Sequence, residues 1–239
     1  MLADFRQRSE KLEHLDTGEY TPEEYESCLV ELRLVNRWLG DASVLRRSVL
    51  TEIERDALKH FSLLDVGAGS GELLRAVAGW ARAKGKRVRL VGLDFGARAA
   101  EAIVEESQEF EEIRSTRGDA LRLPFADGAF DYVMCSLFAH HLRDEQLVTA
   151  LSEMARVARR RVYVIDLHRH PVAYLFYTTV GRIFLHNRLI REDGALSILR
   201  GFAPEELRRL AVRAGLTNAQ VRRRFPYRLV LSVEKGRGI

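Results

Sequence analysis

The sequence has 239 residues, of which 46% are hydrophobic and 30% are charged, and its formal net charge is +4. This length and composition predict a soluble globular protein with one α/β domain plus additions, or at most two small domains. No stretch reaches the roughly 18 uninterrupted apolar residues that a membrane-spanning helix needs. Charged residues from Asp4 onward argue against a signal peptide, so we expect a cytoplasmic protein.

The cysteines and the charge distribution bear on partners. Cys28 and Cys135 show neither disulfide nor metal-site spacing, so we expect free thiols in a reducing compartment. Basic residues outnumber acidic ones only after about residue 120, and such an excess can serve nucleic acid or anionic lipid. These basic residues are mostly scattered arginines and accompany no nucleic-acid-reading motif. We therefore expect no nucleic-acid partner and no stable membrane insertion.

Residues 1–58 are predicted to form an N-terminal helical extension or cap. Thr21 and Pro22 mark a helix start, as N-cap and first-turn proline, and apolar residues at helical spacing continue the helix past Trp38. Asp41 is expected to cap a second helix. These helices either cover one face of a sheet or close over the functional site, and in the second case Trp38 is a candidate substrate contact.

The most informative stretch follows directly. Phe61 to Val66 is a compact apolar run of the buried-strand type, and glycines then occupy alternate positions from Gly67 to Gly71. A glycine turn between a strand and a helix lets a ligand approach the backbone at the carboxyl edge of a sheet. The dinucleotide fingerprint would require glycine where Glu72 stands, and Asp65 would repel a pyrophosphate. An acidic residue at that place suits a ligand with a cationic group.

The run Asp65-Val66-Gly67-Ala68-Gly69-Ser70-Gly71 resembles motif I of the class I S-adenosylmethionine (SAM) methyltransferases. Residues 60–168 and 203–234 resemble type 11-like bacterial small-molecule methyltransferases, with the specific motifs in the first of these spans. SAM carries an ammonium and a sulfonium group, which an acidic, glycine-rich turn would accommodate. The resemblance implies that SAM is bound by Asp65, Gly67, Ala68 and Gly69, with S-adenosylhomocysteine as the product.

Strands and helices alternate through the rest of the chain. This rhythm predicts a doubly wound, mostly parallel sheet with right-handed crossovers, and the resemblance implies a Rossmann-like, seven-stranded sheet with an antiparallel last hairpin. We assign residues 59–239 to the SAM-binding domain. The later strands are expected at 87–94, 113–117, 129–135, 161–167, 217–223 and 227–234, and the helices at 72–84, 96–108, 144–158 and 204–214.

Further cofactor contacts are expected at the ends of the later strands. Asp94 closes the second strand close to the distance of about 20 residues at which an acidic residue binds a ribose diol; a helix cap is the alternative. By resemblance, Asp94 binds the ribose and Phe95 packs on the adenine. Gly118-Asp119-Ala120 resembles a family segment in which Asp119 and the next backbone N–H, that of Ala120, read the adenine amino edge.

The run from Phe130 to Leu142 resembles the family segment that passes the methyl-transfer site, and Ser136 within it is predicted to contact the cofactor. His140 and His141 follow the fourth strand at the same sheet edge. Histidine accepts protons near neutral pH, so either can act as a general base for an oxygen or nitrogen acceptor; a packing or helix-capping role is the alternative. Asp166 and His168, past the fifth strand, are further candidates at this edge. No cluster has metal-ligand spacing, so we predict no metal.

Residues 168–202 are predicted to form a helical lid insertion. The segment is rich in apolar and aromatic residues, which suggests a flat, apolar acceptor; a core helix or a helix in the membrane plane are the alternatives. His168, Tyr174 and Tyr177 are candidate substrate contacts, and His170, directly before a proline, is expected to be structural.

The expected function is SAM-dependent methyl transfer to a small, largely apolar aromatic molecule. O-methylation of a phenolic or polyketide-type secondary metabolite is the first expectation, C-methylation of a quinone-like ring the second and N-methylation the third. A non-catalytic SAM-binding protein that acts through a partner is an alternative of another class, and an NAD oxidoreductase is disfavoured by Glu72. A monomer or a homodimer is expected.

Overall fold

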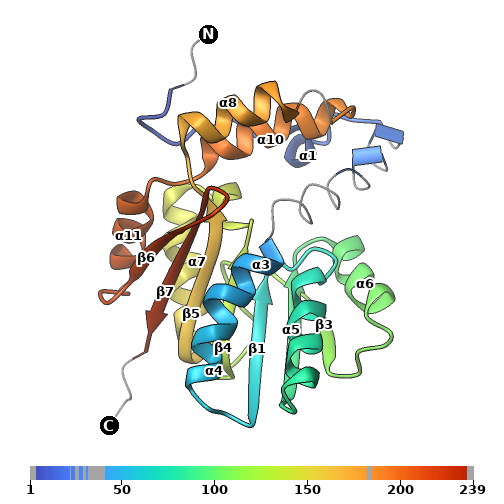
Figure 1. The fold of residues 1–239 in the computed structure, drawn as a ribbon, viewed down its shortest axis with the longest axis vertical. Helices are drawn as coiled ribbons and strands as arrows, with labels where there is room; N and C mark the ends of the chain where they lie inside the picture. Colours follow the sequence, from blue (N-terminus) through green and yellow to red (C-terminus); the bar gives the residue numbers. More distant parts are fainter. Residues whose placement is uncertain are drawn as a thin grey trace.

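The computed structural model describes residues 4–21, 23–24, 27–28, 31, 41–181 and 185–235. Within these ranges the strands form one seven-stranded sheet with the order β3-β2-β1-β4-β5-β7-β6 (Figure 1). The first five strands are parallel, β7 runs antiparallel to β5, and β6 runs antiparallel to β7. This confirms the predicted Rossmann-like sheet and its last hairpin. The strands are β1 (His60–Val66), β2 (Arg87–Asp94), β3 (Ile113–Arg117), β4 (Phe130–Ser136), β5 (Ala158–Leu167), β6 (Gln220–Arg224) and β7 (Arg228–Glu234).

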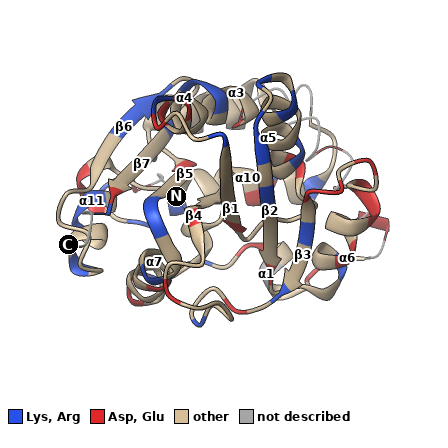
Figure 2. Ribbon diagram, turned by 90° about the horizontal axis from the view of Figure 1, so that it is seen from below, with Lys and Arg blue, Asp and Glu red and all other residues tan. Residues whose placement is uncertain are grey.

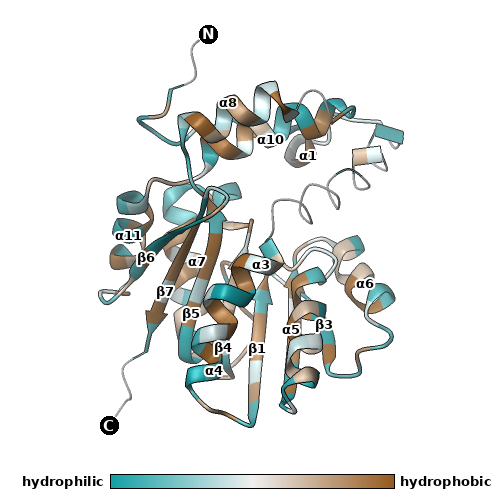
Figure 3. Ribbon diagram, in the orientation of Figure 1, coloured by the Kyte–Doolittle hydropathy of each residue, from teal (hydrophilic) through white to brown (hydrophobic). Residues whose placement is uncertain are grey.

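Helices cover both faces of the sheet because the central strands carry apolar side chains on both sides. In β1, Leu63 packs into one hydrophobic cluster and Leu64 into the other, since successive side chains of a strand point to opposite faces. Figure 3 shows the same character in β7, which is largely brown. One face is covered by α3 (Asp41–Leu45), the π-helical turn η1 (Arg46–Leu50), α4 (Thr51–Arg55), α5 (Glu72–Ala83) and α6 (Ala97–Glu106), and the other by α7 (Asp144–Val157) and α11 (Pro204–Arg213).

Most element bounds agree with the sequence-based expectation to within two residues. The fifth strand begins earlier than expected, at Ala158 directly after α7, and β6 begins later, at Gln220. The helix expected from Thr21 lies largely outside the described residues, and so does Trp38. The cap role expected of Asp41 is not what its side chain does: its carboxylate is buried and Oδ1 lies 2.6 Å from Nε of Arg228 on β7. The Asp41 carboxylate therefore pairs with the Arg228 guanidinium and not with the backbone N–H groups of its own helix.

A second layer lies above the carboxyl ends of the strands (Figure 1). It contains α8 (Pro171–Thr179), α10 (Arg188–Arg200) and the short α1 (His14–Thr17). The carboxylate of Asp193 on α10 accepts the first two N–H groups of α1, at 2.9 and 3.0 Å, which ties the N-terminal region to this layer. We call α1, α8 and α10 the cap layer. None of the helices within the described ranges is long and apolar enough to cross a membrane.

The N-terminal strap, residues 4–13, runs along the cap layer. Ser9 N–H donates to the carbonyl of Leu199 at 3.0 Å, and the Arg200 guanidinium donates to the carbonyl of Lys11 at 2.8 Å. The backbone carbonyl of Phe5 accepts a 3.1 Å hydrogen bond from Arg169, just past β5. The strap therefore connects the cap layer with the edge of the sheet, whereas α3 to α4 pack on the sheet face.

Candidate active site

The carboxyl ends of β1, β2, β4 and β5 meet at one edge of the sheet, where open α/β sheets bind ligands. The glycine turn after β1 lies there, with positive φ angles of 72°, 53° and 78° at Gly67, Gly69 and Gly71. These angles favour glycine because other residues would be strained. Gly71 is also the N-cap of α5, so the turn leads directly into that helix.

Two of these glycines serve different purposes. A methyl group at Gly67 would clash with the ring of Phe138, so this glycine makes room for an aromatic ring of the protein itself. At Gly69 no described atom lies within 4 Å of that position. The expectation that glycine keeps the backbone open to a ligand therefore describes Gly69, whereas Gly67 is explained by the packing of Phe138.

The N–H groups of the turn already have acceptors within the protein. Gly67 and Ala68 both donate to the carbonyl of Leu93, at 2.8 and 3.1 Å, and Gly69 donates to Oδ2 of Asp94 at 3.0 Å. A phosphate-binding turn needs such N–H groups free to point at the anion. This turn therefore suits a cationic ligand better than a dinucleotide, in agreement with the sequence-based preference.

Two predicted cofactor contacts are buried polar groups that lack a partner in the described part of the chain. Oδ1 of Asp65, at the end of β1, and Oγ of Ser136, at the end of the adjacent β4, accept and donate no hydrogen bond there. Burial, followed by the nearby charge of Asp94, raises the pKa of Asp65 to about 8. An unsatisfied buried polar atom costs about 1 to 3 kcal/mol, and a ligand that carries an ammonium group would satisfy both the charge and the hydrogen bond.

The other predicted cofactor residues lie at the ends of β2 and β3. Asp94 is half-buried, and its two carboxylate oxygens accept the N–H groups of Gly69 and Gly96, both at 3.0 Å. It thus orders the turn into α6, while each oxygen keeps a second lone pair for a ligand. Phe95 is 72% exposed and available to a flat partner. Asp119 is exposed and accepts the N–H of Leu121 at 2.8 Å, beside the buried Ala120. The cofactor roles of these residues stay predictions.

A buried histidine–carboxylate pair lies at the ends of β4 and β5. Nδ1 of His140 is 2.7 Å from Oδ1 of Asp166, and the His140 backbone N–H donates to Oδ2 at 3.2 Å. His140 is 3% exposed and Asp166 is fully buried. Burial alone would raise the pKa of Asp166, but its interactions with His140 outweigh burial and lower that pKa. The ionised carboxylate therefore pairs with Nδ1 and leaves Nε2 as the ring nitrogen that can accept a proton.

The structure adds a residue to this pair that the sequence analysis missed. Oε1 of the buried Glu13 lies 3.9 Å from Nε2 of His140 and accepts a 2.8 Å hydrogen bond from the hydroxyl of Ser197. The Arg200 guanidinium, also buried, lies 3.9 Å from the same oxygen. Its Nη2 donates to the carbonyl of His141 at 2.7 Å. The sequence carries no signal for this contact, because Glu13 is one of many acidic residues in a charged N-terminal stretch.

His141 is the more accessible of the two rings. It is half-buried, and its ring centroid lies 4.3 Å from that of His140. Among the described residues, Glu13, His140 and His141 offer three potential ligand atoms within 4.8 Å of one another, a spacing that a metal ion could use. The nearby guanidinium of Arg200 would repel a cation at the same carboxylate oxygen. The expectation that the protein binds no metal stays a prediction.

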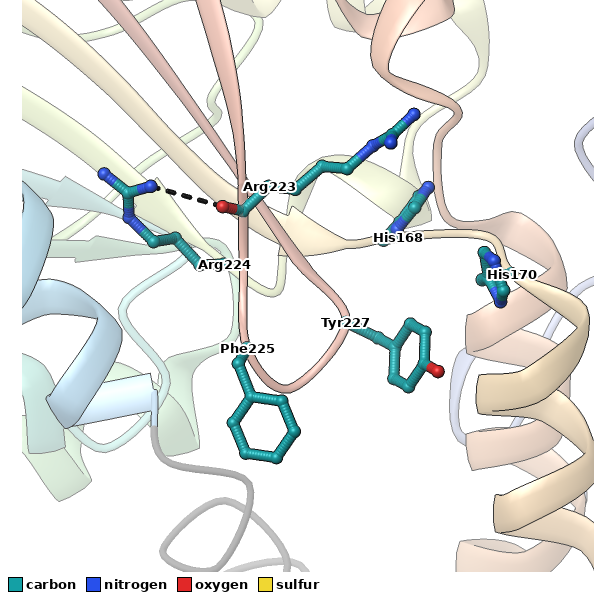
Figure 4. Close-up of a pocket in the computed structure, with 6 residues that line it drawn as sticks. All are labelled: His168, His170, Arg223, Arg224, Phe225 and Tyr227. Carbon is teal, nitrogen blue, oxygen red and sulfur yellow. Dashed lines mark hydrogen bonds between the residues drawn. The ribbon is translucent and has the colours of Figure 1, made fainter.

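The structure separates the predicted substrate contacts. His168 lines a cavity of about 410 Å³ next to the hairpin of β6 and β7 (Figure 4). The Tyr174 ring makes an edge contact with Phe5, with 5.6 Å between centroids. The side chain of Tyr177, a residue of α8, reaches α10, where its hydroxyl donates to the carbonyl of Ile190 at 2.5 Å. That hydroxyl is therefore already used within the cap layer, and a substrate role for it stays an untested prediction.

His170 has the structural role that was expected of it. Its Nδ1 accepts the N–H of Val172 at 3.2 Å, which caps the N-terminus of α8 ahead of Pro171. His170 also lines the cavity, together with Arg223, Arg224, Phe225 and Tyr227 from the hairpin. The sequence analysis identified this hairpin but not its role at a cavity. Phe225 could have indicated this cavity, because it is an aromatic residue in a turn between two strands rather than at a core position of a strand.

The sheet order and its antiparallel last hairpin match the fold of solved SAM-dependent methyltransferases, and the turn suits a cationic ligand. Comparison with known proteins agrees, since residues 63–161 match the family model described as a methyltransferase domain. Residues 63–161 are therefore a methyltransferase domain, and the comparisons support a SAM-dependent methyltransferase with SAM as its cofactor.

Similar proteins are described as methyltransferases. Demethylmenaquinone methyltransferases from Staphylococcus aureus strains JH9 and Newman are 29% identical over 171 residues, which is 66% of this chain and 69% of theirs. A magnesium protoporphyrin IX methyltransferase from Synechocystis PCC 6803 with bound S-adenosylhomocysteine has a TM-score of 0.59 and 17% identity, over 83% of this chain and 84% of its own. A SAM-dependent methyltransferase from Aquifex aeolicus has a TM-score of 0.59 and 15% identity, over 81% of this chain and 98% of its own. At these identities the two structures show the shared fold.

Proposed function

We propose that this methyltransferase transfers a methyl group to an oxygen of a small, largely apolar aromatic acceptor, with the His140–His141 pair as the general base. The observation that carries the proposal is the 2.7 Å contact between Nδ1 of His140 and the buried carboxylate of Asp166. A histidine whose proton is held on one nitrogen presents the other nitrogen as a base, which suits removal of a phenolic proton.

The residues that would hold SAM are those whose chemistry fits its parts. Bound SAM supplies a methyl group on a positively charged sulfur, which needs no further activation. Asp65 and Ser136 offer their unsatisfied oxygens to the ammonium end, Asp94 offers two carboxylate oxygens to the ribose diol, and Phe95 offers an exposed ring to the adenine face. The remaining expected contacts are the Gly67-Ala68-Gly69 turn, the Asp119 carboxylate and the Ala120 backbone N–H.

The chain's own residues then orient the acceptor and remove its proton. Asp166 fixes the His140 ring, and Glu13 with Arg200 closes the other side of that ring. His141, beside it and half-buried, is the ring that an acceptor reaches first. We infer that the acceptor proton leaves through this pair. The cap layer, which includes residues 171–179 and 188–200 of the expected lid, excludes water above the edge and so holds acceptor and donor in line.

A second candidate is methylation of a ring carbon in a quinone-like acceptor. It is favoured by the demethylmenaquinone methyltransferases of Staphylococcus aureus, which are 29% identical to this chain over 171 residues. The same base would serve both reactions, because a reduced quinone also has a phenolic proton that must leave. The two candidates differ in the atom that receives the methyl group.

Methyl-labelled SAM distinguishes the candidates. The protein is incubated with a panel that contains simple phenols, hydroxynaphthalenes and 1,4-dihydroxynaphthalene under reducing conditions, and the product is analysed by NMR. An O-methyl signal supports the first candidate and a ring-methyl signal the second. His140→Gln and His141→Gln are expected to slow transfer without weakening SAM binding, and unchanged transfer in both variants would refute the assigned base.

A further inference from the structure

The cavity at the β6–β7 hairpin is lined by basic and aromatic side chains. It has a volume of about 410 Å³ and lies where the end of β5 meets the tip of the hairpin (Figure 4). None of the described residues that line it is acidic. The lining consists of two histidines, two arginines and two aromatic residues: His168, His170, Arg223, Arg224, Phe225 and Tyr227.

Arg223 differs from the arginines on either side of it in β6. Arg222 reaches Oε1 of Glu52 at 3.3 Å, and Arg224 donates to the hydroxyl of Ser48 at 2.9 Å. The exposed Arg223 side chain has no hydrogen bond or ion pair among the residues that the structure describes. Figure 2 shows the resulting basic character of β6, and in Figure 4 the side chains of Arg223 and Arg224 point away from each other. A guanidinium that faces a cavity without a partner is a donor set for an anion.

The two histidines that line the cavity add further polar groups to the Arg223 guanidinium. Burial, then the charges of His170 and Arg223, lower the pKa of His168 to about 4, so that its ring is neutral at pH 7. The Nδ1 atom of His170 accepts the N–H of Val172, so Nε2 is the ring nitrogen that can donate a hydrogen bond to a ligand in the cavity, which Arg223 also lines.

The aromatic residues form a flat wall next to these donors. The centroid of Tyr227 lies 5.1 Å from that of His170 and 6.4 Å from that of His168, with interplanar angles of 34°. Tyr227 has a φ of 45°, a conformation that costs a residue with a side chain about 1 to 2 kcal/mol. The ring of Phe225 is 84% exposed. Neither ring is explained by turn geometry or by core packing, and both suit stacking on an aromatic ligand.

We propose that this cavity binds an aromatic carboxylate, with the ring against Tyr227 and Phe225 and the carboxylate on Arg223 and His170. The inference deepens the proposed function by naming the acceptor class: an aromatic acid, anchored by its carboxylate, that presents a hydroxyl group for methylation. The placement agrees with this role, because His168 lies two residues beyond Asp166, the carboxylate that orients His140. The bond that forms is oxygen to methyl, the bond that breaks is sulfur to methyl, and the hydroxyl proton passes to the histidine pair.

Binding of matched ligands tests the proposal without turnover. Calorimetry with 4-hydroxybenzoate and 6-hydroxy-2-naphthoate, each beside its neutral amide, is carried out on the full chain with S-adenosylhomocysteine present. A charge-assisted hydrogen bond is worth a factor of roughly 10 to 100 in affinity. We expect at least one acid to bind more tightly than its amide by a factor in this range. Arg223→Gln is expected to abolish that preference, and Arg222→Gln, the matched control on the same strand, to retain it.

The outcomes separate this inference from the function on which it rests. Equal affinity for both acids and their amides, no binding of either acid, or an unchanged preference in Arg223→Gln would overturn the aromatic-acid site. Methyl transfer to neutral phenols would still support the proposed function in that case. Conversely, selective binding of an acid with no transfer of labelled methyl to any hydroxylated acceptor would retain the site and refute the proposed reaction.

Discussion

Asp65 makes the electrostatic basis of cofactor binding measurable. Its carboxyl group is buried, Oδ1 lacks a partner among the described residues, and burial with the charge of Asp94 raises its pKa to about 8. At pH 7 the group is therefore about nine-tenths protonated in the free protein. If the SAM ammonium pairs with the ionised form, binding at pH 7 must release about 0.9 proton. The affinity of the protein for SAM should therefore weaken about tenfold for each pH unit below 7.

The same shift predicts a dependence of stability on pH. A carboxyl group whose pKa is raised in the folded state favours the folded protein while it is protonated. That stability is fully present below the unfolded pKa, near 3.8, and is lost as pH rises through the folded value of about 8. The full shift of about four pKa units corresponds to a loss of about 6 kcal/mol, since one pKa unit corresponds to about 1.4 kcal/mol. Asp65→Asn keeps the size of the side chain and removes the titration, so it should be more stable than the wild type above pH 8.

Calorimetry of SAM binding in phosphate and in Tris measures the proton release, because these buffers have different ionisation enthalpies. Titrations between pH 6 and 7.5 avoid most of the titration of the amino group of SAM, whose ordinary pKa is about 8. Asp65→Asn is the control and should bind SAM weakly with no proton release. A binding enthalpy that is independent of the buffer at pH 7 in the wild type would refute the pairing of Asp65 with the cation.

Three further substitutions test other parts of the structure. Asp166→Asn should lower kcat about 100- to 10,000-fold at unchanged SAM affinity, because an amide no longer holds the Nδ1 proton of His140 as an anion does; labelled-methyl transfer measures this. Arg228→Met should lower the free energy of unfolding by about 3 to 5 kcal/mol, because it leaves the buried Asp41 uncompensated, and the double variant with Asp41→Asn should recover much of this loss in urea unfolding. Gly67→Ala should destabilise the protein by more than about 2 kcal/mol through its clash with Phe138, whereas Gly69→Ala should cost about 1 kcal/mol of backbone strain alone.

Each of these substitutions has an outcome that contradicts its reasoning. Turnover of Asp166→Asn equal to the wild type would show that orientation of His140 is unimportant. A double variant as unstable as Arg228→Met alone would show that the loss does not come from an isolated charge on Asp41. Equal destabilisation at Gly67 and Gly69 would show that the Phe138 contact has no energetic weight.

The sheet could be predicted from the sequence because its signals are local. The run from Phe61 to Val66 is apolar and short, and Asp94 ends a similar run before a helix start, so both strand ends are readable without any knowledge of distant residues. The pairing of Asp41 with Arg228 was not readable in this way. It joins positions 187 residues apart, and no periodicity of either segment specifies the contact.

The candidate site likewise combines features that the local sequence predicts with long-range contacts that it does not. His140 and Asp166 were each identified at the correct edge, because parallel strands bring their carboxyl ends together. The approach of Glu13 to His140 depends on the path of the N-terminal strap across the cap layer, which no local pattern specifies. The cavity beside the hairpin depends on which face of β6 each arginine occupies, and the register of Arg223 with Leu229 of β7 sets that face. Such registers follow from tertiary pairing rather than from local pattern.

Asp65 and Asp166 show how one edge can hold two carboxylates with opposite tasks. Both are buried at the ends of parallel strands, so burial pushes both pKa values upward. Asp166 has His140 at 2.7 Å and its pKa is lowered, whereas Asp65 has only another carboxylate nearby and its pKa is raised. A carboxylate with a resident histidine partner keeps its charge and orients a base, and one without a partner gains its charge when a cation arrives. The different neighbours therefore support the proposal that β4 and β5 carry the groups for proton transfer and β1 the group for cation binding.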